Sequence, residues 1–361
     1  MGDTFGTLRE RTMNLNSIAQ ELQRVTADLH QVNPKAGLRR FSILGLIFLS
    51  FVMLAWSLPN GILFVAATML AGVFYGFLLI CTHDMTHQTL TGWNWFDRIM
   101  PRLISWPMLW PYSIYAELHR LHHAWNGINL QDPERLQWTW QEYQQAHPIL
   151  RWYVSHQWLC NIFILGGVGL IIKTFIKGIR FQNLVVSMRR QILLDVTGIV
   201  FVHSIMLMLA IFQGEILRYV LFWFILERII GIIAQTRDYL EHYGLWGKFT
   251  SHQLTQLFAS RNIETNSLVS WLMGGLNYHA VHHTFPNIPF NQLPTAFERI
   301  QKVLEKHNLP LMKLEGGYLQ STYWLGCHPS LIGEVDFSNA TNRHRMIPLI
   351  AGGTKTVATE I

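Results

Sequence analysis

The stretch GILFVAATMLAGVFYGFLLIC, residues 61–81, contains no charged side chain over 21 residues. As an α-helix rising 1.5 Å per residue it would be about 31 Å long, which matches the hydrocarbon core of a bilayer. The apolar run 41–57 precedes it, and only three uncharged residues separate the two runs. These runs predict a transmembrane helical hairpin, and the runs 192–212 and 216–235 predict a second one.

The overall composition is that of an integral membrane protein. Of the 361 residues, 50% are hydrophobic and only 14% are charged, and the mean hydropathy is +0.19. Soluble domains carry about a quarter charged residues. The net charge of +6 is explained by Lys and Arg retained on the cytoplasmic side, and nucleic-acid binding is a poorer explanation. Cys81, Cys160 and Cys327 are scattered without a CxxC pair, so we expect neither a disulfide framework nor a thiolate metal site.

The run 158–172 is apolar but has only 15 residues and three glycines, so we expect an interfacial or re-entrant helix there rather than a span. With that assignment, three histidine-rich motifs lie next to the open ends of the two hairpins. Lys and Arg flank these ends, whereas the turn 58–60 carries none, so the motifs are predicted to face the cytoplasm. Segments 101–116 and 265–277 are aromatic and apolar, as expected for interfacial helices.

The expected fold is therefore an all-α integral membrane protein. Four transmembrane helices in two hairpins would carry a cytosolic histidine-rich helical cap and interfacial helices. We expect a polar N-terminal segment over 1–38, the membrane domain over 39–334 and a polar, mobile C-terminal tail over 335–361.

Eight of the 17 histidines lie in three short motifs: HDMTH (His83, His87), HRLHH (His119, His122, His123) and HAVHH (His279, His282, His283). Spacings of three and four residues place imidazoles on one face of a helix. His242, in RDYLEHYG, is a ninth candidate ligand, with Asp238 one turn earlier. Nine histidines are too many for a structural zinc site with four ligands, so two metal ions fit better. Iron suits oxygen chemistry, and zinc remains the rival by ligand type alone.

The motifs HDMTH, HRLHH and LNYHAVHHTFP resemble the three histidine boxes of the membrane fatty acid desaturase and hydroxylase superfamily, over residues from about 40 to 300. The resemblance implies two Fe ions held by the nine histidines, O2 as co-substrate and a lipid or acyl substrate from the bilayer. HRLHHAWNGINLQDPE and GGLNYHAVHHTFP are most similar to acyl desaturases, whereas DYLEHYGL is similar to a segment of alkane monooxygenases. We therefore expect a fatty acyl desaturase. A hydroxylase or monooxygenase acting on alkane, fatty acid or carotenoid is the alternative.

Asp238 stands where several members of that superfamily have asparagine. Its carboxylate could orient the His242 ring, bind iron directly or through water, or form a salt bridge with Arg237 or Arg228. Inside the last predicted span, Glu227 and Arg228 are expected to form a buried ion pair with a partner such as Asp195.

The electrons for such a reaction must come from another protein. The sequence has no His-Pro-Gly-Gly haem segment, no CxxC pair and no G-x-G-x-x-G, so we expect a separate donor of the ferredoxin, cytochrome b5 or rubredoxin type. A membrane metal transporter is a remote alternative. Such a protein would need ligands inside the spans, whereas these histidines lie outside them.

Overall fold

The computed structural model describes residues 3–249, 251–335 and 344–349. Helices make up most of this part of the chain, as predicted, and the strands form only two short pairs. The chain divides into two compact units: unit 1 comprises residues 1–31, 122–157 and 239–361, and unit 2 comprises residues 32–121 and 158–238. Two of the four divisions fall inside helices α5 (Tyr112–Trp125) and α11 (Ile216–His242).

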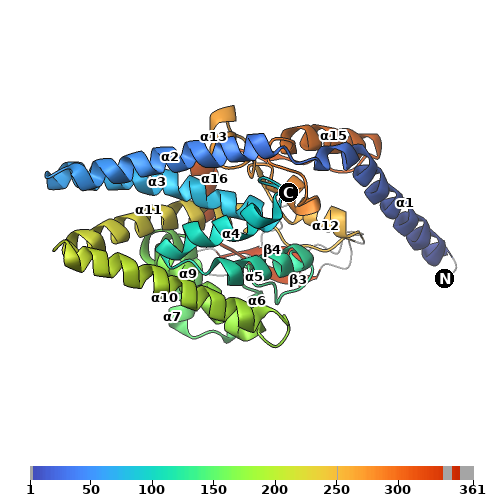
Figure 1. The fold of residues 1–361 in the computed structure, drawn as a ribbon. Helices are drawn as coiled ribbons and strands as arrows, with labels where there is room; N and C mark the ends of the chain where they lie inside the picture. Colours follow the sequence, from blue (N-terminus) through green and yellow to red (C-terminus); the bar gives the residue numbers. More distant parts are fainter. Residues whose placement is uncertain (1–2, 250, 336–343, 350–361) are drawn as a thin grey trace. The chain divides into compact units, whose positions relative to one another are not determined.

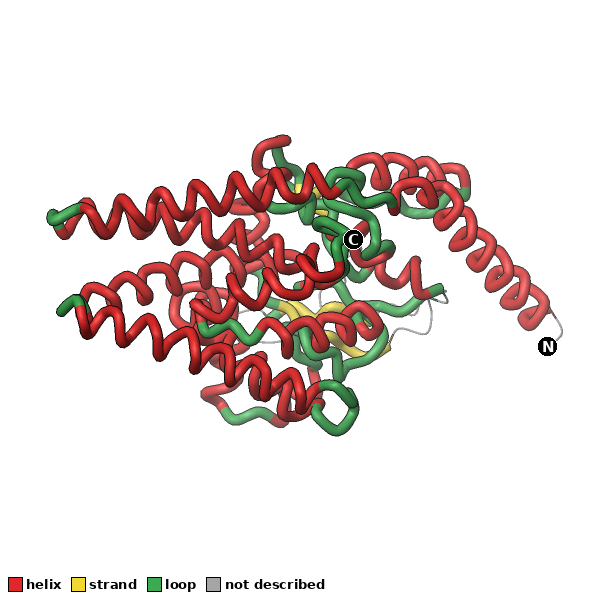
Figure 2. Tube along the Cα trace, viewed as in Figure 1, coloured by secondary structure: helices red, strands yellow, loops and turns green. Residues whose placement is uncertain are grey.

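Unit 2 contains the long apolar helices. Helices α2 (Pro34–Ser57) and α3 (Gly61–Thr86) run antiparallel from the turn at 58–60 (Figures 1 and 2). Asparagines cap both helices: Asn33 accepts hydrogen bonds from two backbone N–H groups of α2, and Asn60 does the same for α3. The two helices pack through stacked ring pairs, with centroids 4.3 Å apart for Phe48 and Tyr75.

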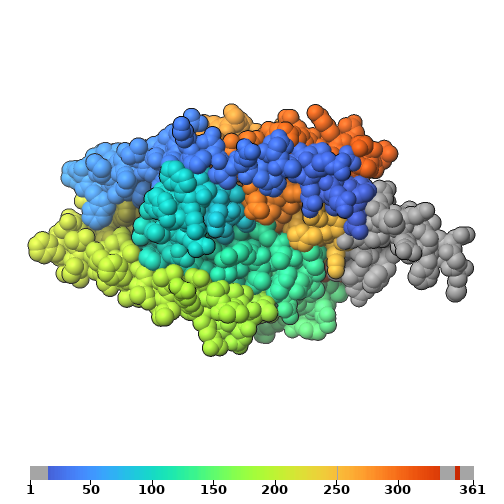
Figure 3. Space-filling model, turned by 45° about the vertical axis from the view of Figure 1, so that its right-hand side comes forward, coloured from blue at the N-terminus to red at the C-terminus, as the bar shows by residue number. Residues whose placement is uncertain are grey.

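Helices α10 (Met188–Phe212) and α11 leave a common turn at Gly214, whose φ of +68° suits glycine. The hydroxyl of Tyr219 on α11 lies 3.2 Å from His203 Nδ1 on α10. Many large apolar side chains of α10 face outward, and Leu193 and Phe201 are 68% and 65% exposed. This helix runs along the surface in Figure 3, where it is yellow-green. Such exposed apolar surface indicates contact with lipid.

Four described helical runs are long and apolar enough to cross a membrane: Pro34–Ser57, Gly61–Thr86, Gln157–Phe181 and Met188–Phe212. The third contains the run 158–172, and the helical segment there is longer than the 15 apolar residues indicated. By length and composition it could cross a membrane, and the interfacial or re-entrant placement expected for it stays a prediction. Helix α8 (Gln157–Leu159), a π-helix (Cys160–Leu165) and α9 (Gly166–Phe181) follow one another over 25 residues. Helix α11 covers the predicted run 216–235 but is not among these four candidates, so its crossing of the membrane stays a prediction.

The charged pair inside α11 is held differently from the expected arrangement. Glu227 and Arg228 pair with each other, and Glu227 also accepts a hydrogen bond of 2.7 Å from the backbone N–H of Val168. Asp195 is not their partner. Its carboxylate accepts hydrogen bonds from Trp106 Nε1 and from the N–H of Ile114, at 3.0 and 2.9 Å. The expectation about Asp195 was therefore wrong, because irregular backbone near α9 satisfies the α11 pair instead.

The remaining elements of unit 2 are short. They comprise α4 (Asn94–Ser105), the 3-10 helix Trp106–Met108 and the first part of α5. They occupy the segment 101–116 that was predicted to lie in the membrane interface. An added Cβ at Gly198 of α10 would meet Trp106 at 2.5 Å, so the absence of a side chain lets this segment approach α10 closely.

Unit 1 has one long helix, α1 (Asp3–Thr26). Its other helices are shorter: the 3-10 helix Ala27–His30, α6 (Trp140–Gln145), α7 (Pro148–Ser155), α12 (His252–Phe258), α13 (Ser267–Leu272), α14 (His279–Thr284), α15 (Leu293–Lys306) and α16 (Tyr318–Cys327). One hydrophobic core joins α1, α12, α14 and α15 through buried residues such as Leu22, Leu257, Val281 and Ile300. The N-terminal segment is thus a helix that packs against α15 by its apolar face.

Two strand pairs complete unit 1. Strand β1 (Asn262–Ile263) pairs in parallel with β2 (Leu314–Glu315), and β3 (Ser330–Val335) pairs antiparallel with β4 (His344–Pro348). Strand β4 belongs to the expected tail 335–361, so this part of the tail is ordered by pairing with β3. Residues 336–343 and 350–361 lie outside the described part of the chain.

Candidate metal centre

Three of the predicted ligands lie together in unit 2. His83 is in the last turns of α3, His87 caps that helix, and His119 is on α5. Their ring centroids are 5.2 Å apart for His83 and His87, 4.8 Å for His83 and His119, and 5.2 Å for His87 and His119. Each ring offers a nitrogen within 4.8 Å of the others, so this triangle could hold a metal ion.

A buried ion pair fixes the end of α3 that carries this triangle. Arg40 of α2 donates to Asp84 at 2.9 Å, and both side chains are buried. The backbone carbonyl of Asp84 also accepts a hydrogen bond from the N–H of Thr89 at 2.9 Å. This bond holds the chain that follows α3 against the end of the helix. On α5, the Tyr115 ring stacks on His119 at 5.1 Å. The motif HDMTH therefore combines two candidate ligands with the anchor that orients them.

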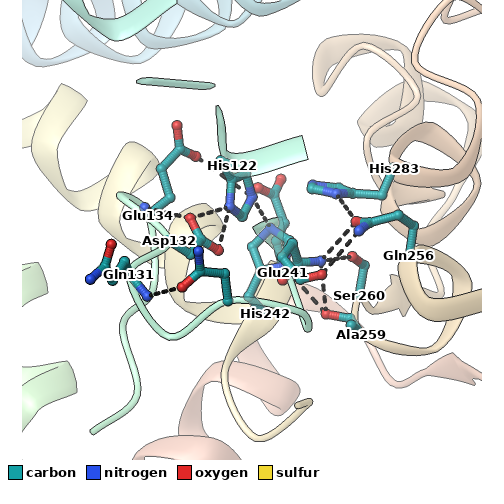
Figure 4. Close-up of polar contacts among 12 residues, drawn as sticks. His122, Gln131, Asp132, Glu134, Glu241, His242, Gln256, Ala259, Ser260 and His283 are labelled. Carbon is teal, nitrogen blue, oxygen red and sulfur yellow. Dashed lines mark hydrogen bonds and ion pairs between the residues drawn. The ribbon is translucent and has the colours of Figure 1, made fainter. Parts of the chain in front are cut away.

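Four other predicted ligands form a second cluster inside unit 1, and Figure 4 shows three of them, His122, His242 and His283. His122, His242, His279 and His283 are at most 9% exposed. The Nε2 atom of His242 lies 3.0 Å from Nε2 of His122 and 3.0 Å from Nε2 of His279. The His283 ring is within 4.8 Å of the other three, measured between centroids.

Hydrogen bonds on the far side of two rings decide which nitrogen carries the proton. His122 Nδ1 lies 2.9 Å from both carboxylate oxygens of Asp132, and His242 Nδ1 faces the carbonyl oxygen of Ala259 at 3.4 Å. Both partners can only accept, so each Nδ1 donates and each Nε2 presents a lone pair. Two lone pairs 3.0 Å apart repel each other unless a cation lies between them.

This geometry fits a metal ion. Imidazole nitrogens bind ions such as zinc at about 2.0–2.1 Å, so two ligands of one ion lie about 2.8–3.4 Å apart at angles between about 90° and 109°. Burial, followed by the neighbouring imidazoles His123, His279 and His242, lowers the pKa of His283 well below its usual value. The ring is therefore neutral at neutral pH, which is the form that binds metals.

The other two predicted ligands, His123 and His282, lie in the same unit. Their ring centroids are 4.9 Å apart, and the His123 ring stacks on His283 at 4.1 Å. Unit 1 thus brings together six of the nine predicted histidines, and unit 2 brings together the other three.

Several acidic or amide side chains at this cluster were not predicted from the sequence. Glu241 Oε2 lies 3.5 Å from His279 Nε2, and Glu134 Oε2 lies 3.8 Å from His122 Nε2. Asp132 holds His122, as described above, and Gln256 contacts His283 at 3.0 Å. Glu241 is adjacent to His242, and Asp132 and Glu134 follow HRLHH in the segment QDPE, so their positions in the sequence were the available signal. Nothing in the sequence around Gln256 marks it.

Asp238, the predicted catalytic residue, pairs with a lysine in unit 2. Its Oδ2 lies 3.4 Å from Lys173 Nζ, and both side chains are partly exposed. The partner is therefore neither Arg237 nor Arg228 among the described contacts. A role for Asp238 at the metal stays a prediction.

A family model described as Fatty acid desaturase matches residues 60–315, which is more than half of the chain and includes all nine histidines. The chain belongs to the fatty acid desaturase family. This confirms the resemblance drawn from the three histidine motifs.

Individual relatives carry desaturase names. The chain is 25% identical to the Delta(8)-fatty-acid desaturase of Euglena gracilis over 271 residues, 68% of this chain and 62% of that protein. It is 25% identical to a fatty acid desaturase of Bacillus subtilis (strain 168) over 280 residues, 75% and 76% of the two chains. It is 20% identical to the sn-1 oleoyl-lipid 12-desaturase of Picosynechococcus sp. over 306 residues, 82% and 85% of the two. The alignment with the Euglena protein, the first of these three, covers less than two thirds of that protein's length.

Proposed function

We propose that this protein is an O2-dependent di-iron fatty acyl desaturase that introduces a double bond into an acyl chain taken from the bilayer. The observation that carries the proposal is the unit 1 cluster, where lone pairs of His122 and His242 face each other at 3.0 Å in a buried site. Family membership and the desaturase names of the relatives support the same reaction class.

The chain's own residues have distinct roles in this proposal. His122, His242, His279 and His283 hold one iron ion, with Glu241 as an additional carboxylate candidate, and His83, His87 and His119 bind a second. His123 and His282 are further ligands. When bound, iron supplies the O2 chemistry that removes hydrogen from an unactivated C–H bond. Asp132 keeps the His122 ring in the ligand tautomer and orientation.

The stoichiometry of desaturation shows that the reaction needs electrons and protons as well as O2. Two hydrogen atoms leave adjacent carbons, and O2 with two electrons and two protons is reduced to two water molecules. The electrons come from a separate donor of the ferredoxin, cytochrome b5 or rubredoxin type. The predicted position of the histidines on the cytoplasmic side would give such a donor access, and the bilayer would deliver the acyl chain.

Metal analysis tests the proposal without requiring the substrate. The full chain, purified in detergent after expression with iron, is expected to contain two iron ions per chain. His122→Ala and His83→Ala should each lower the iron content while the protein still inserts into membranes. Zinc in place of iron, or iron content unchanged in both variants, would contradict the assignment. Uptake of metal into vesicles containing the protein, without lipid oxidation, would instead indicate a transporter.

A further inference from the structure

Gln256 is the buried amide whose position next to the histidine cluster nothing above explains. It lies on α12, and its side chain is fully buried. Its Oε1 is 3.0 Å from His283 Nδ1 (Figure 4). Its Nε2 donates to the backbone carbonyl of Asn126 at 2.9 Å. The amide therefore links the segment after α5 to α14.

The contact with Asn126 determines which way the amide points. A backbone carbonyl can only accept, so the NH2 end of Gln256 must face Asn126 and the oxygen must face His283. The Asn126 side-chain Nδ2 also donates to that oxygen, at 3.2 Å, and to Ser260 Oγ at 3.1 Å. A flipped amide would set its NH2 group against the Asn126 NH2 group. The network thus permits one orientation.

This orientation sets the tautomer of His283. An amide oxygen is acceptor-only, so His283 Nδ1 must carry the proton and Nε2 must carry the lone pair. Among the described residues, His283 Nε2 is buried and has no hydrogen-bond partner. A ring nitrogen that binds a metal must have a free lone pair. A histidine that only packs in the core normally has both ring nitrogens hydrogen-bonded.

The backbone holds the network in place. Asn126 is 1% exposed, and its N–H donates to the carbonyl of His122 at 2.8 Å. Gly127 has a φ of +71°, and an added Cβ there would lie 2.7 Å from Cβ of Ala259. The close approach of this glycine brings the Asn126 segment against the end of α12, where Gln256 can reach it.

We propose that Gln256 is a positioning residue that fixes His283 as an Nε2 ligand of the metal. The inference rests on the proposed iron site and adds a residue to it. Partners that hold the outer nitrogen of a ligating histidine typically contribute 10- to 100-fold to metal affinity or activity. Gln256 therefore controls how firmly the ion is held.

The test is the rate at which a ferrous-iron chelator removes iron from the purified full chain. Gln256→Met keeps a similar unbranched shape but lacks a strong acceptor, so iron loss should be at least about 10-fold faster than in the wild type. Gln256→Glu keeps an acceptor oxygen toward His283 and should lose iron at close to the wild-type rate. Gln253→Met is the matched control, because this glutamine on the same helix bonds to Ser251.

The outcomes separate the two proposals. A wild-type protein without iron contradicts the proposed function, and the ligand role of His283 with it. If the wild type holds iron and Gln256→Met loses it equally slowly, only the positioning role is wrong, even when the melting temperature of the iron-free protein falls. Should the methionine variant not fold, Gln256→Asn takes its place, because its amide is one methylene shorter and no longer reaches His283: iron loss about 10-fold faster supports the role, and wild-type-like retention overturns it.

Discussion

At the scale of single residues, the ligand tautomers depend on groups that never touch the metal. Asp132 accepts a hydrogen bond from His122 Nδ1, and the carbonyl of Ala259 accepts one from His242 Nδ1. The Nε2 atoms of both histidines therefore carry the lone pairs that can bind a metal. The histidines themselves could be predicted from their spacing. Their partners could not, because Asp132 acts through a loop whose course no periodicity reveals.

Removing the Asp132 acceptor should loosen the metal. Asp132→Leu removes the carboxylate that accepts from His122 Nδ1, and we expect iron affinity to fall by about 10- to 100-fold. Asp132→Asn is the control, because its amide oxygen can still accept from Nδ1 and the change should be smaller. Iron content after dialysis against a chelator measures both. Equal retention in the leucine variant and the wild type would show that Asp132 serves only the fold.

The role of the Asp238 charge can be tested by a substitution that removes the charge and keeps the shape of the side chain. Asp238→Asn restores the residue found in several superfamily members, and its lost contact with Lys173 is partly exposed, so stability should change by less than about 1 kcal/mol. We expect retained iron and altered turnover. Unchanged turnover and iron in this variant, with lower folded yield in Asp238→Ala, would place the carboxylate in the scaffold.

At the scale of elements, the long apolar helices were predictable and their ends were not. The run 158–172 looked too short because hydropathy falls at Lys173, yet the helix continues to Phe181 with Lys and Arg along it. Hydrogen bonding continues a helix past the point where its side chains turn polar. Likewise, β4 was not foreseen, since a strand in a polar tail depends on a partner such as β3.

The α1–α15 contact should respond to acid. Glu21 on α1 bonds to Lys306 and to His307 at 2.7 Å each, and the His307 hydrogen bond is the larger cause that lowers the Glu21 pKa to about 2. A carboxylate with a lowered pKa stabilises the fold above its unfolded pKa of about 4.5, and that contribution is lost as the pH falls toward 2. Proteolysis near residue 26 should therefore increase over this window. In Glu21→Gln the same increase should be absent; if it persists, another group is responsible.

At the scale of the whole molecule, the composition and the histidine motifs were enough to predict a helical membrane protein of the desaturase family, as the family match confirms. The side of the membrane on which each part lies is a separate prediction, drawn from the positive charge near the hairpin ends.

Topology can be read by cysteine labelling. In a variant lacking the native cysteines, single cysteines at 61 and 214 should be protected from an impermeant reagent applied to the cytoplasmic side. Cysteines at 35 and 287 should react from that side. Labelling of 61 or 214 from the cytoplasm would overturn the two-hairpin topology.

We propose that these histidines hold the iron that an acyl desaturase needs. The most direct measurement is the fatty acid profile of aerated host cells that express the full chain, compared with cells that express His122→Ala at the same level. We expect a fatty acid with one additional double bond in the first culture and its loss in the second. Hydroxylated products in place of the alkene, or the same new double bond in both cultures, would contradict it.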